Sequence, residues 1–205
     1  MIAMLDTSTS FEQAEKELGC RVEQLFTPLT RFKPQRPDEP FAIDNGAFAG
    51  FNTKAFLALL QREYERRALC RFVAVPDVVG SAIRTMEVFS HWRYKLSGWP
   101  IALVVQDGQE NISIPWQEID AIFVGGTTEW KLSDKVRHIV LAAKAIGKWV
   151  HVGRVNTPAR FEYFEKMGAD SIDGTGLSRY SWMRNAIYEK AIRPRFEFME
   201  EEQND

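Results

Sequence analysis

The chain has 205 residues, and 45% of them are hydrophobic, which is enough to bury the core of one sizeable domain. Its 26 lysines and arginines nearly balance 28 aspartates and glutamates, and the resulting formal net charge of −2 excludes a global basic field, although a local basic patch remains compatible with it. Two cysteines without a Cys/His cluster imply no disulfide framework and argue against a structural zinc site.

Short apolar runs bounded by Gly, Pro or Asp recur along the chain and predict strands buried on both faces of a parallel sheet. They lie at residues 2–5, 22–26, 41–43, 72–75, 101–105, 121–124 and 149–152, and an eighth ends at Asp173. Helices are predicted at residues 11–18, 53–69, 81–96, 133–146, 158–167 and 178–190, with Ser10, Ser81, Ser133 and Thr157 available as caps near four of the starts.

The predicted strands and helices alternate along the chain, except at two connections. Residues 27–40 contain four prolines and are predicted to form a long loop, and residues 107–118 fall short of a full helix. The whole pattern favours a compact (β/α)8 barrel of the TIM type in residues 1–195, with a doubly wound open sheet as the alternative. Residues 196–205 are predicted to be an acidic, disordered tail.

Polar or glycine residues stand where six of the predicted strands end. These strand-end residues are Asp44, Asp77 after Pro76, Gln106, the pair Gly125 and Gly126, Gly153 with Arg154, and Asp173. Because parallel α/β folds place their chemistry at the carboxyl ends of the strands, we expect these residues to face one cavity. Asp173, delivered by a strand into a glycine-broken turn, is a candidate nucleophile.

Five ordered motifs between about Phe26 and Arg179 resemble those of the tRNA-guanine transglycosylase superfamily. They are Asp44-Asn45-Gly46-Ala47-Phe48, Pro76-Asp77 with Val105-Gln106-Asp107-Gly108, Gly125-Gly126 followed by Glu129, Val152-Gly153 followed by Thr157-Pro158, and Asp173 through Arg179. The cysteine-rich zinc site and its subdomain, which the tRNA enzymes carry beyond the barrel, have no counterpart here. The chain therefore looks most like the compact, zinc-free phage and bacterial branch that exchanges guanine for a 7-deazaguanine in DNA.

The resemblance implies a role for each matching residue. Asp173 would be the nucleophile and Asp44 would carry the proton of the leaving base. Asp77 would read the guanine N1–H and amine, and Gln106 with the Gly126 backbone would read O6. The remaining implied base-pocket residues are Phe48 and Val152, which would sandwich the ring, together with Asn45, Gly125 and Gly153.

The resemblance also implies the partners: DNA rather than tRNA, and a 7-deazaguanine base such as preQ0, with neither a cofactor nor a metal. Five cations predicted near the barrel mouth are candidates for phosphate contacts, namely Arg31, Lys33, Arg36, Arg154 and Arg179. His151, on a predicted strand, is interpreted as a core histidine without a catalytic role.

Two other functions stay open: a non-catalytic base-binding or nucleic-acid-binding subunit that relies on a protein partner, and a guanine N-glycosidase in which water resolves the intermediate. No run approaches the ~18 apolar residues of a membrane span, so we expect no membrane association and a cytoplasmic protein of a bacterium or a phage-infected host.

Overall fold

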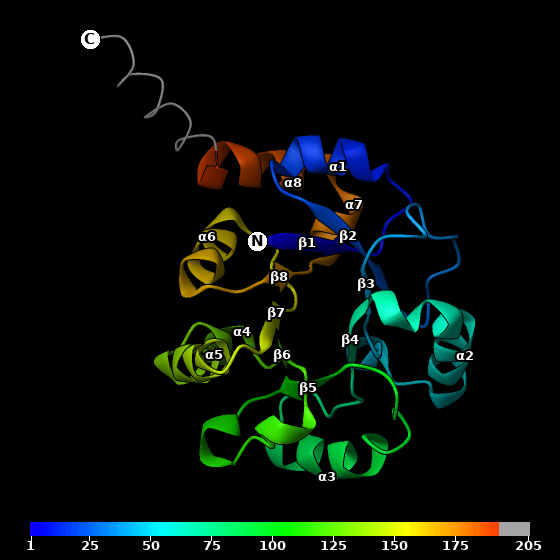
Figure 1. The fold of residues 1–205 in the computed structure, drawn as a ribbon. Helices are drawn as coiled ribbons and strands as arrows, with labels where there is room; N and C mark the ends of the chain where they lie inside the picture. Colours follow the sequence, from blue (N-terminus) through cyan, green and yellow to red (C-terminus); the bar gives the residue numbers. More distant parts are fainter. Residues whose placement is uncertain (193–205) are drawn as a thin grey trace.

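A computed structural model describes residues 1–192. Eight parallel strands close into a barrel in chain order, with β1 paired to both β2 and β8 (Figure 1). The closure confirms the (β/α)8 barrel and is incompatible with the open sheet. The predicted tail at residues 196–205 lies outside the described residues.

The strands are β1 Ile2–Leu5, β2 Val22–Phe26, β3 Phe41–Ile43, β4 Cys70–Ala74, β5 Ile101–Val105, β6 Ala121–Val124, β7 Trp149–Val152 and β8 Ser171–Ile172. Their side chains alternate between two apolar layers, as the period of a strand requires. One layer fills the barrel interior and includes Met4, Leu25, Phe72 and Phe123. The other packs the outside of the barrel against the helices.

Most helices begin and end where the sequence supplies a cap. In α1 (Phe11–Leu18) the Ser10 hydroxyl accepts a hydrogen bond from the Gln13 amide, and Gly19 ends the helix in the left-handed conformation. The same N-terminal cap is made by Ser81 before α3 (Ala82–Trp92) and by Thr157 before α6 (Pro158–Met167). The α5 helix (Asp134–Ala145) begins after Ser133, whose side chain makes no capping bond.

The predicted helices at 53–69 and 178–190 are both wrong in their extent. The first is α2 (Thr53–Glu63) followed by a 3₁₀ segment, η2 (Tyr64–Leu69), which turns the chain beside the buried Glu63 carboxylate. The second is divided at an extended Tyr180 into α7 (Thr175–Arg179) and α8 (Ser181–Ile187), followed by η5 (Tyr188–Ile192).

The division at Tyr180 has a tertiary cause. The buried Arg184 of α8 donates to the Leu177 carbonyl of α7 and also to the Glu17 carboxylate of α1. These bonds satisfy a helix-end carbonyl and bring α8 beside α1 (Figure 1).

Other connections contain only short turns of helix. The β3–α2 loop holds η1 (Ala47–Ala49), the β5–β6 connection holds η3 (Gln109–Asn111) and η4 (Trp116–Glu118), and α4 (Thr128–Lys131) precedes α5. The β5–β6 connection is therefore short of a full helix, as predicted, whereas α4 was not predicted.

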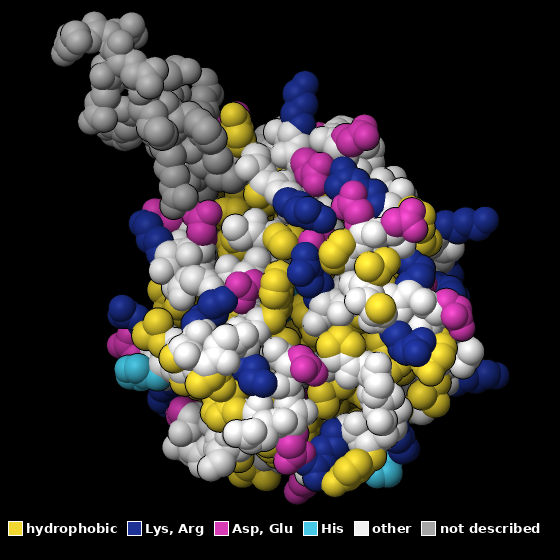
Figure 2. All heavy atoms as spheres, viewed as in Figure 1, with side chains coloured by type: hydrophobic (Ala, Val, Ile, Leu, Met, Phe, Trp, Pro, Cys, Tyr) yellow, Lys and Arg dark blue, Asp and Glu magenta, His cyan; other side chains and the backbone are white. Residues whose placement is uncertain are grey.

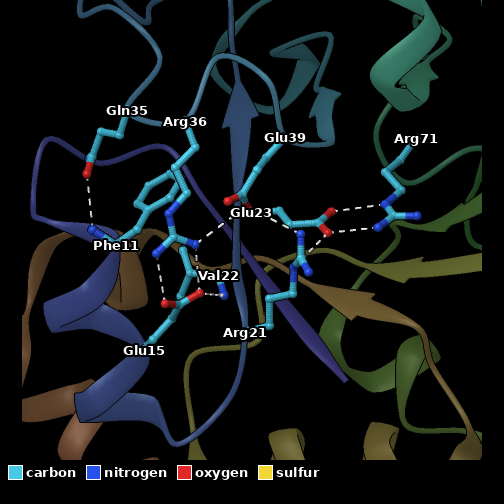
Figure 3. Close-up of polar contacts among 9 residues, drawn as sticks. All are labelled: Phe11, Glu15, Arg21, Val22, Glu23, Gln35, Arg36, Glu39 and Arg71. Carbon is cyan, nitrogen blue, oxygen red and sulfur yellow. Dashed lines mark hydrogen bonds and ion pairs between the residues drawn. The ribbon is translucent and has the colours of Figure 1, made fainter.

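Residues 27–40 take the place of a helix between the end of β2 and the start of β3. The loop therefore runs from the barrel mouth toward the opposite end. Its last part is held by an ion-pair network that joins three arginines to three glutamates: Arg36 to Glu15 and Glu39, Arg21 to Glu39 and Glu23, and Arg71 to Glu23 (Figure 3). Glu23 is buried inside the amino end of the barrel, far from the strand ends that carry the motifs.

Candidate active site

The strand-end residues converge at the carboxyl end of the barrel, as expected from the sequence. They line a small cavity of about 60 Å³ whose walls include Asp44, Asp77, Gln106, Gly125, Gly126, Gly153, Arg154 and Asp173. Six different strands therefore contribute to one site. Its apolar walls are Val104 and Phe123 from the barrel interior, Phe48 from η1, and Val79 from the β4–α3 loop.

Asp77 and Gln106 form the polar edge of the small cavity. Asp77 accepts hydrogen bonds from Asn45 Nδ2 at 2.9 Å and from Gln106 Nε2 at 2.6 Å. Gln106 Oε1 accepts from the backbone N–H groups of Gly80 and Gly126, which fixes the orientation of the amide. One Nε2 hydrogen and the remaining lone pairs of the carboxylate are therefore available to a bound molecule.

Two carboxyl groups of the small cavity, those of Asp44 and Asp77, have pKa values shifted toward the neutral form. Burial, together with the negative charges of Asp173 and Asp77, raises the pKa of Asp44 to about 7. Burial also raises the pKa of Asp77, against the lowering effect of its bonds to Asn45 and Gln106. A carboxyl group with a pKa near neutrality can both donate and accept a proton.

Asp173 is held at both carboxylate oxygens. Oδ1 accepts from the Arg154 backbone N–H at 2.9 Å, and Oδ2 lies 2.9 Å from His151 Nε2. Arg154 adopts a positive φ of 60°, an uncommon conformation for a residue other than glycine. Its guanidinium donates to the Gly126 carbonyl and lies over the Phe48 ring, 4.5 Å from the centroid, and both residues line the small cavity.

A second, larger cavity of about 800 Å³ adjoins the first. Asp44, Phe48, Arg154 and Asp173 line both cavities. The larger one is further bounded by the proline-rich loop and by the β8–α7 turn, and its lining residues include Asp6, Arg31, Asn156, Gly174, Ser178 and Arg179. Asp173 therefore stands between a small cavity and a large one.

The structure brings together only three of the five predicted phosphate-binding cations. Arg31, Arg154 and Arg179 line the large cavity, whereas Lys33 and Arg36 do not. Arg36 makes two hydrogen bonds to the Glu15 carboxylate, because the loop has by then descended along the barrel. On the face seen in Figure 2, basic and acidic side chains are interspersed rather than gathered into a single field.

The prediction that Val152 stacks on a base is wrong in its geometry. Its side chain is buried in the layer between the barrel and the helices, because His151 points inward and neighbouring strand residues alternate. Asn45 likewise does not line the cavity, and it contributes by holding Asp77.

Three residues of the site were missed. Asp6 follows β1 and lines the large cavity, where it accepts from Thr27 and Thr30, and the strand-end rule applied to the first strand would have found it. His151 was interpreted as core only. The buried Lys131 donates to the Gly153 carbonyl at 2.5 Å, and burial lowers the pKa of its amino group to about 8. No feature of the surrounding sequence indicated that Lys131 would lie beside the site.

Two motif glycines are required by close packing. A Cβ atom on Gly125 would lie 2.7 Å from Gln106 Nε2, and one on Gly153 would lie 2.6 Å from the Phe123 ring. Since real Cβ contacts are not this short, any side chain at either position would displace the wall of the small cavity.

Comparison with known proteins adds no assignment. The sequence matches no protein-family model, and it has no significant similarity to a curated protein. Among the described residues, no group of three or more His, Cys, Asp or Glu side chains is arranged to hold a metal ion, and no helix is long and apolar enough to cross a membrane.

Proposed function

We propose that the protein is a base-exchange glycosyltransferase that replaces guanine in a polynucleotide, DNA in the first instance, with a 7-deazaguanine derivative such as preQ0. The observation that carries this proposal is the position of Asp173 between the two cavities. The small cavity has a polar edge and apolar walls suited to a purine. The large one has arginines suited to the sugar-phosphate chain of a flipped nucleotide.

The unused hydrogen-bonding groups of the small cavity match the Watson–Crick edge of guanine. The free Gln106 Nε2 hydrogen complements O6, and the Asp77 carboxylate complements the adjacent N1–H and amine. Adenine would instead present its N1 acceptor to the carboxylate and its amino group to the Gln106 donor. The bases on the two sides of the exchange share the guanine edge, so one pocket can serve both.

The chemistry balances as two displacements at C1′. In the first, an Asp173 oxygen bonds to C1′, the C1′–N9 bond breaks, and the electron pair leaves with the base, which takes a proton from Asp44. In the second, N9 of the incoming base loses its proton to Asp44 and attacks C1′, and the ester bond to Asp173 breaks. Two inversions retain the configuration of the sugar.

The test is guanine release and adduct formation. The protein is incubated with preQ0 and duplex DNA carrying radiolabelled guanine, and in parallel with tRNA labelled in the same way. We expect release of label from DNA and a covalent protein–DNA ester that maps to Asp173. Asp173→Asn should abolish both, while Asp107→Asn, a matched strand-end carboxylate that lines neither cavity and binds Thr127, should retain both.

Each other outcome contradicts part of the proposal. Label release without incorporation of preQ0 indicates hydrolysis, and binding without release indicates an accessory subunit. Exchange in tRNA alone would reassign the polynucleotide. An adduct on another carboxylate would remove Asp173 from the nucleophile role.

A further inference from the structure

A buried chain of hydrogen bonds lies behind Asp173 inside the barrel. Trp149 Nε1 donates to Ser171 Oγ at 2.9 Å, Ser171 Oγ lies 2.9 Å from His151 Nδ1, and His151 Nε2 lies 2.9 Å from Asp173 Oδ2. Ser171 and His151 are fully buried. The hydrogen-bonded chain thus links the interior of the barrel to Asp173, which borders both cavities.

Only one arrangement of protons gives every polar group in this chain of hydrogen bonds a partner. The Ser171 oxygen already receives the indole proton, and among the hydrogen bonds of the described residues the hydroxyl proton has no acceptor besides His151 Nδ1. If Nδ1 carried a proton, the buried hydroxyl of Ser171 would be left without an acceptor, which is costly. Nδ1 therefore accepts, Nε2 carries the proton of a neutral imidazole, and Asp173 Oδ2 accepts from it.

Packing fixes the direction of this last bond. The His151 ring lies between two phenylalanines, with its centroid 5.1 Å from that of Phe72 and 4.5 Å from that of Phe123. Because the ring cannot turn without displacing them, Nε2 stays directed at Asp173. Together with the Arg154 N–H on Oδ1, this bond uses one lone pair on each carboxylate oxygen and leaves the others facing the cavities.

We propose that His151 is a positioning residue for Asp173, held by Ser171 and Trp149 in the Nε2–H tautomer. In this state it orients the nucleophile by a hydrogen bond without transferring a proton to it, so that the carboxylate keeps the electron pair that bonds to C1′. The inference rests on the proposed function for the identity of the reaction, whereas the tautomer stands independently of it.

The tautomer is tested by nitrogen NMR of the imidazoles. The chain has three histidines, so a His151→Gln variant identifies the His151 signals by difference. We expect an unprotonated Nδ1 and a protonated Nε2, with an Nε2 proton resonance that moves upfield in Asp173→Ala and an Nδ1 signal that shifts in Ser171→Ala. A protonated Nδ1, or an Nε2 proton resonance unchanged in Asp173→Ala, would overturn the inference.

The positioning role is tested by two variants of similar bulk. His151→Phe keeps the ring packing but removes the donor, whereas His151→Gln retains an N–H group that can reach Asp173. We expect the single-turnover rate of guanine release to fall about 10- to 100-fold in the Phe variant and to recover in part in the Gln variant, with guanine affinity unchanged in both. Phe89→Leu, a buried residue of α3 in the outer apolar layer, is the packing control, because it should lower stability with little effect on the rate.

Equal rates in all three variants, or a rate that follows stability alone, would contradict the positioning role. If the wild-type protein releases no guanine, the proposed function fails, and the NMR spectra still decide whether His151 donates to Asp173.

Discussion

Burial and the charges of two neighbouring carboxylates both raise the pKa of Asp44, and the free energy of unfolding therefore depends on pH. The pKa of the carboxyl group rises from 3.8 to about 7 on folding. Between these values the folded state keeps a proton that the unfolded state has released, so the free energy of unfolding decreases as pH rises from about 4 to about 7.

Asp44→Asn, which resembles the protonated form, should therefore stabilise the protein above pH 7 by ~1–3 kcal/mol and change its stability little below pH 4. Urea denaturation of the wild-type protein and the variant, once above pH 7 and once below pH 4, measures the difference in the free energy of unfolding. Asp6 and Asp77, whose pKa values are also raised, are present in both proteins and cancel in the comparison. A stability difference that is the same at both pH values would show that Asp44 does not keep its proton.

Under the proposed function, Asp77 is the residue expected to select the purine that the small cavity accepts. Asp77→Asn replaces an acceptor by an amide that can donate toward the guanine N1–H, so one favourable contact is lost and a repulsive one is added. Guanine affinity measured by calorimetry should fall by ~1–3 kcal/mol or more, and the preference for guanine over adenine should narrow. Asp107→Asn should change neither, and an unchanged guanine affinity in the Asp77 variant would place the purine reader elsewhere.

At the scale of elements, local sequence signals predicted those features that depend on local chemistry. All eight strands and the helix starts at Ser10, Ser81 and Thr157 were predicted, because apolar runs and side-chain caps act within a few residues. The break at Tyr180 was not, since it depends on Arg184 reaching an α7 carbonyl and a glutamate of α1.

The candidate site shows the same division. Strand-end position placed Asp44, Asp77, Gln106 and Asp173 in one cavity correctly, whereas the facing of Val152 was assigned wrongly. His151 is a buried histidine, as predicted, but its contact with Asp173 was not predicted. Strand alternation puts His151 and Val152 on opposite faces of β7, but the sequence alone did not show which of the two points into the barrel. The descent of the proline-rich loop, which removes Arg36 from the mouth, is a property of the closed barrel and not of the loop sequence.

The β7–α6 turn provides a prediction at this scale. In Gly153→Ala the new Cβ would lie 2.6 and 2.9 Å from atoms of the Phe123 ring, which lines the small cavity, so this wall of the cavity must move. We expect guanine binding, measured by calorimetry, to be lost while the barrel remains folded by circular dichroism. Gly147→Ala is the control: its Cβ meets nothing within 4 Å, so its positive φ should reduce stability without affecting guanine binding. Normal guanine affinity in Gly153→Ala would place the base outside this cavity.

In the whole molecule, the amino end of the barrel contains a buried ion-pair network, whereas the carboxyl end contains the two cavities. The amino end is closed by the network around Glu23, whose side chain is fully buried and accepts two hydrogen bonds from Arg71 (Figure 3). Glutamine cannot keep the charge-assisted hydrogen bonds from Arg71, whose own side chain is partly exposed, so Glu23→Gln should reduce the free energy of unfolding by ~1.5–3 kcal/mol. Glu39→Gln, in the exposed part of the network, should cost about 1 kcal/mol or less.

Guanine binding should be unchanged in both folded variants, because the network lies at the opposite end of the barrel from the cavities. Urea denaturation and calorimetry measure the two quantities. Equal destabilisation by the two substitutions would show that burial of Glu23 does not govern the strength of the network.

The proposed function requires the carboxyl end of the barrel to bind a polyanion, although the whole chain carries a formal charge of −2. Arg31 and Arg179 line the large cavity from the proline-rich loop and from α7, on either side of the strand that the proposed function requires. Their arrangement predicts a local contribution to DNA binding that depends on salt, because each phosphate neutralised by a cation releases counterions.

Reversing both charges, in Arg31→Glu with Arg179→Glu, should weaken DNA binding and reduce the slope of log affinity against log salt by about 1 for each lost phosphate contact. Free guanine should bind as before, since neither arginine lines the small cavity. Lys16→Glu with Arg67→Glu, just before β2 and β4 at the amino end of the barrel, is the matched double charge reversal and should leave the slope unchanged. If this control lowers the slope as much as the Arg31 and Arg179 double variant does, DNA binding reflects the net charge of the molecule and the polynucleotide does not lie in the large cavity.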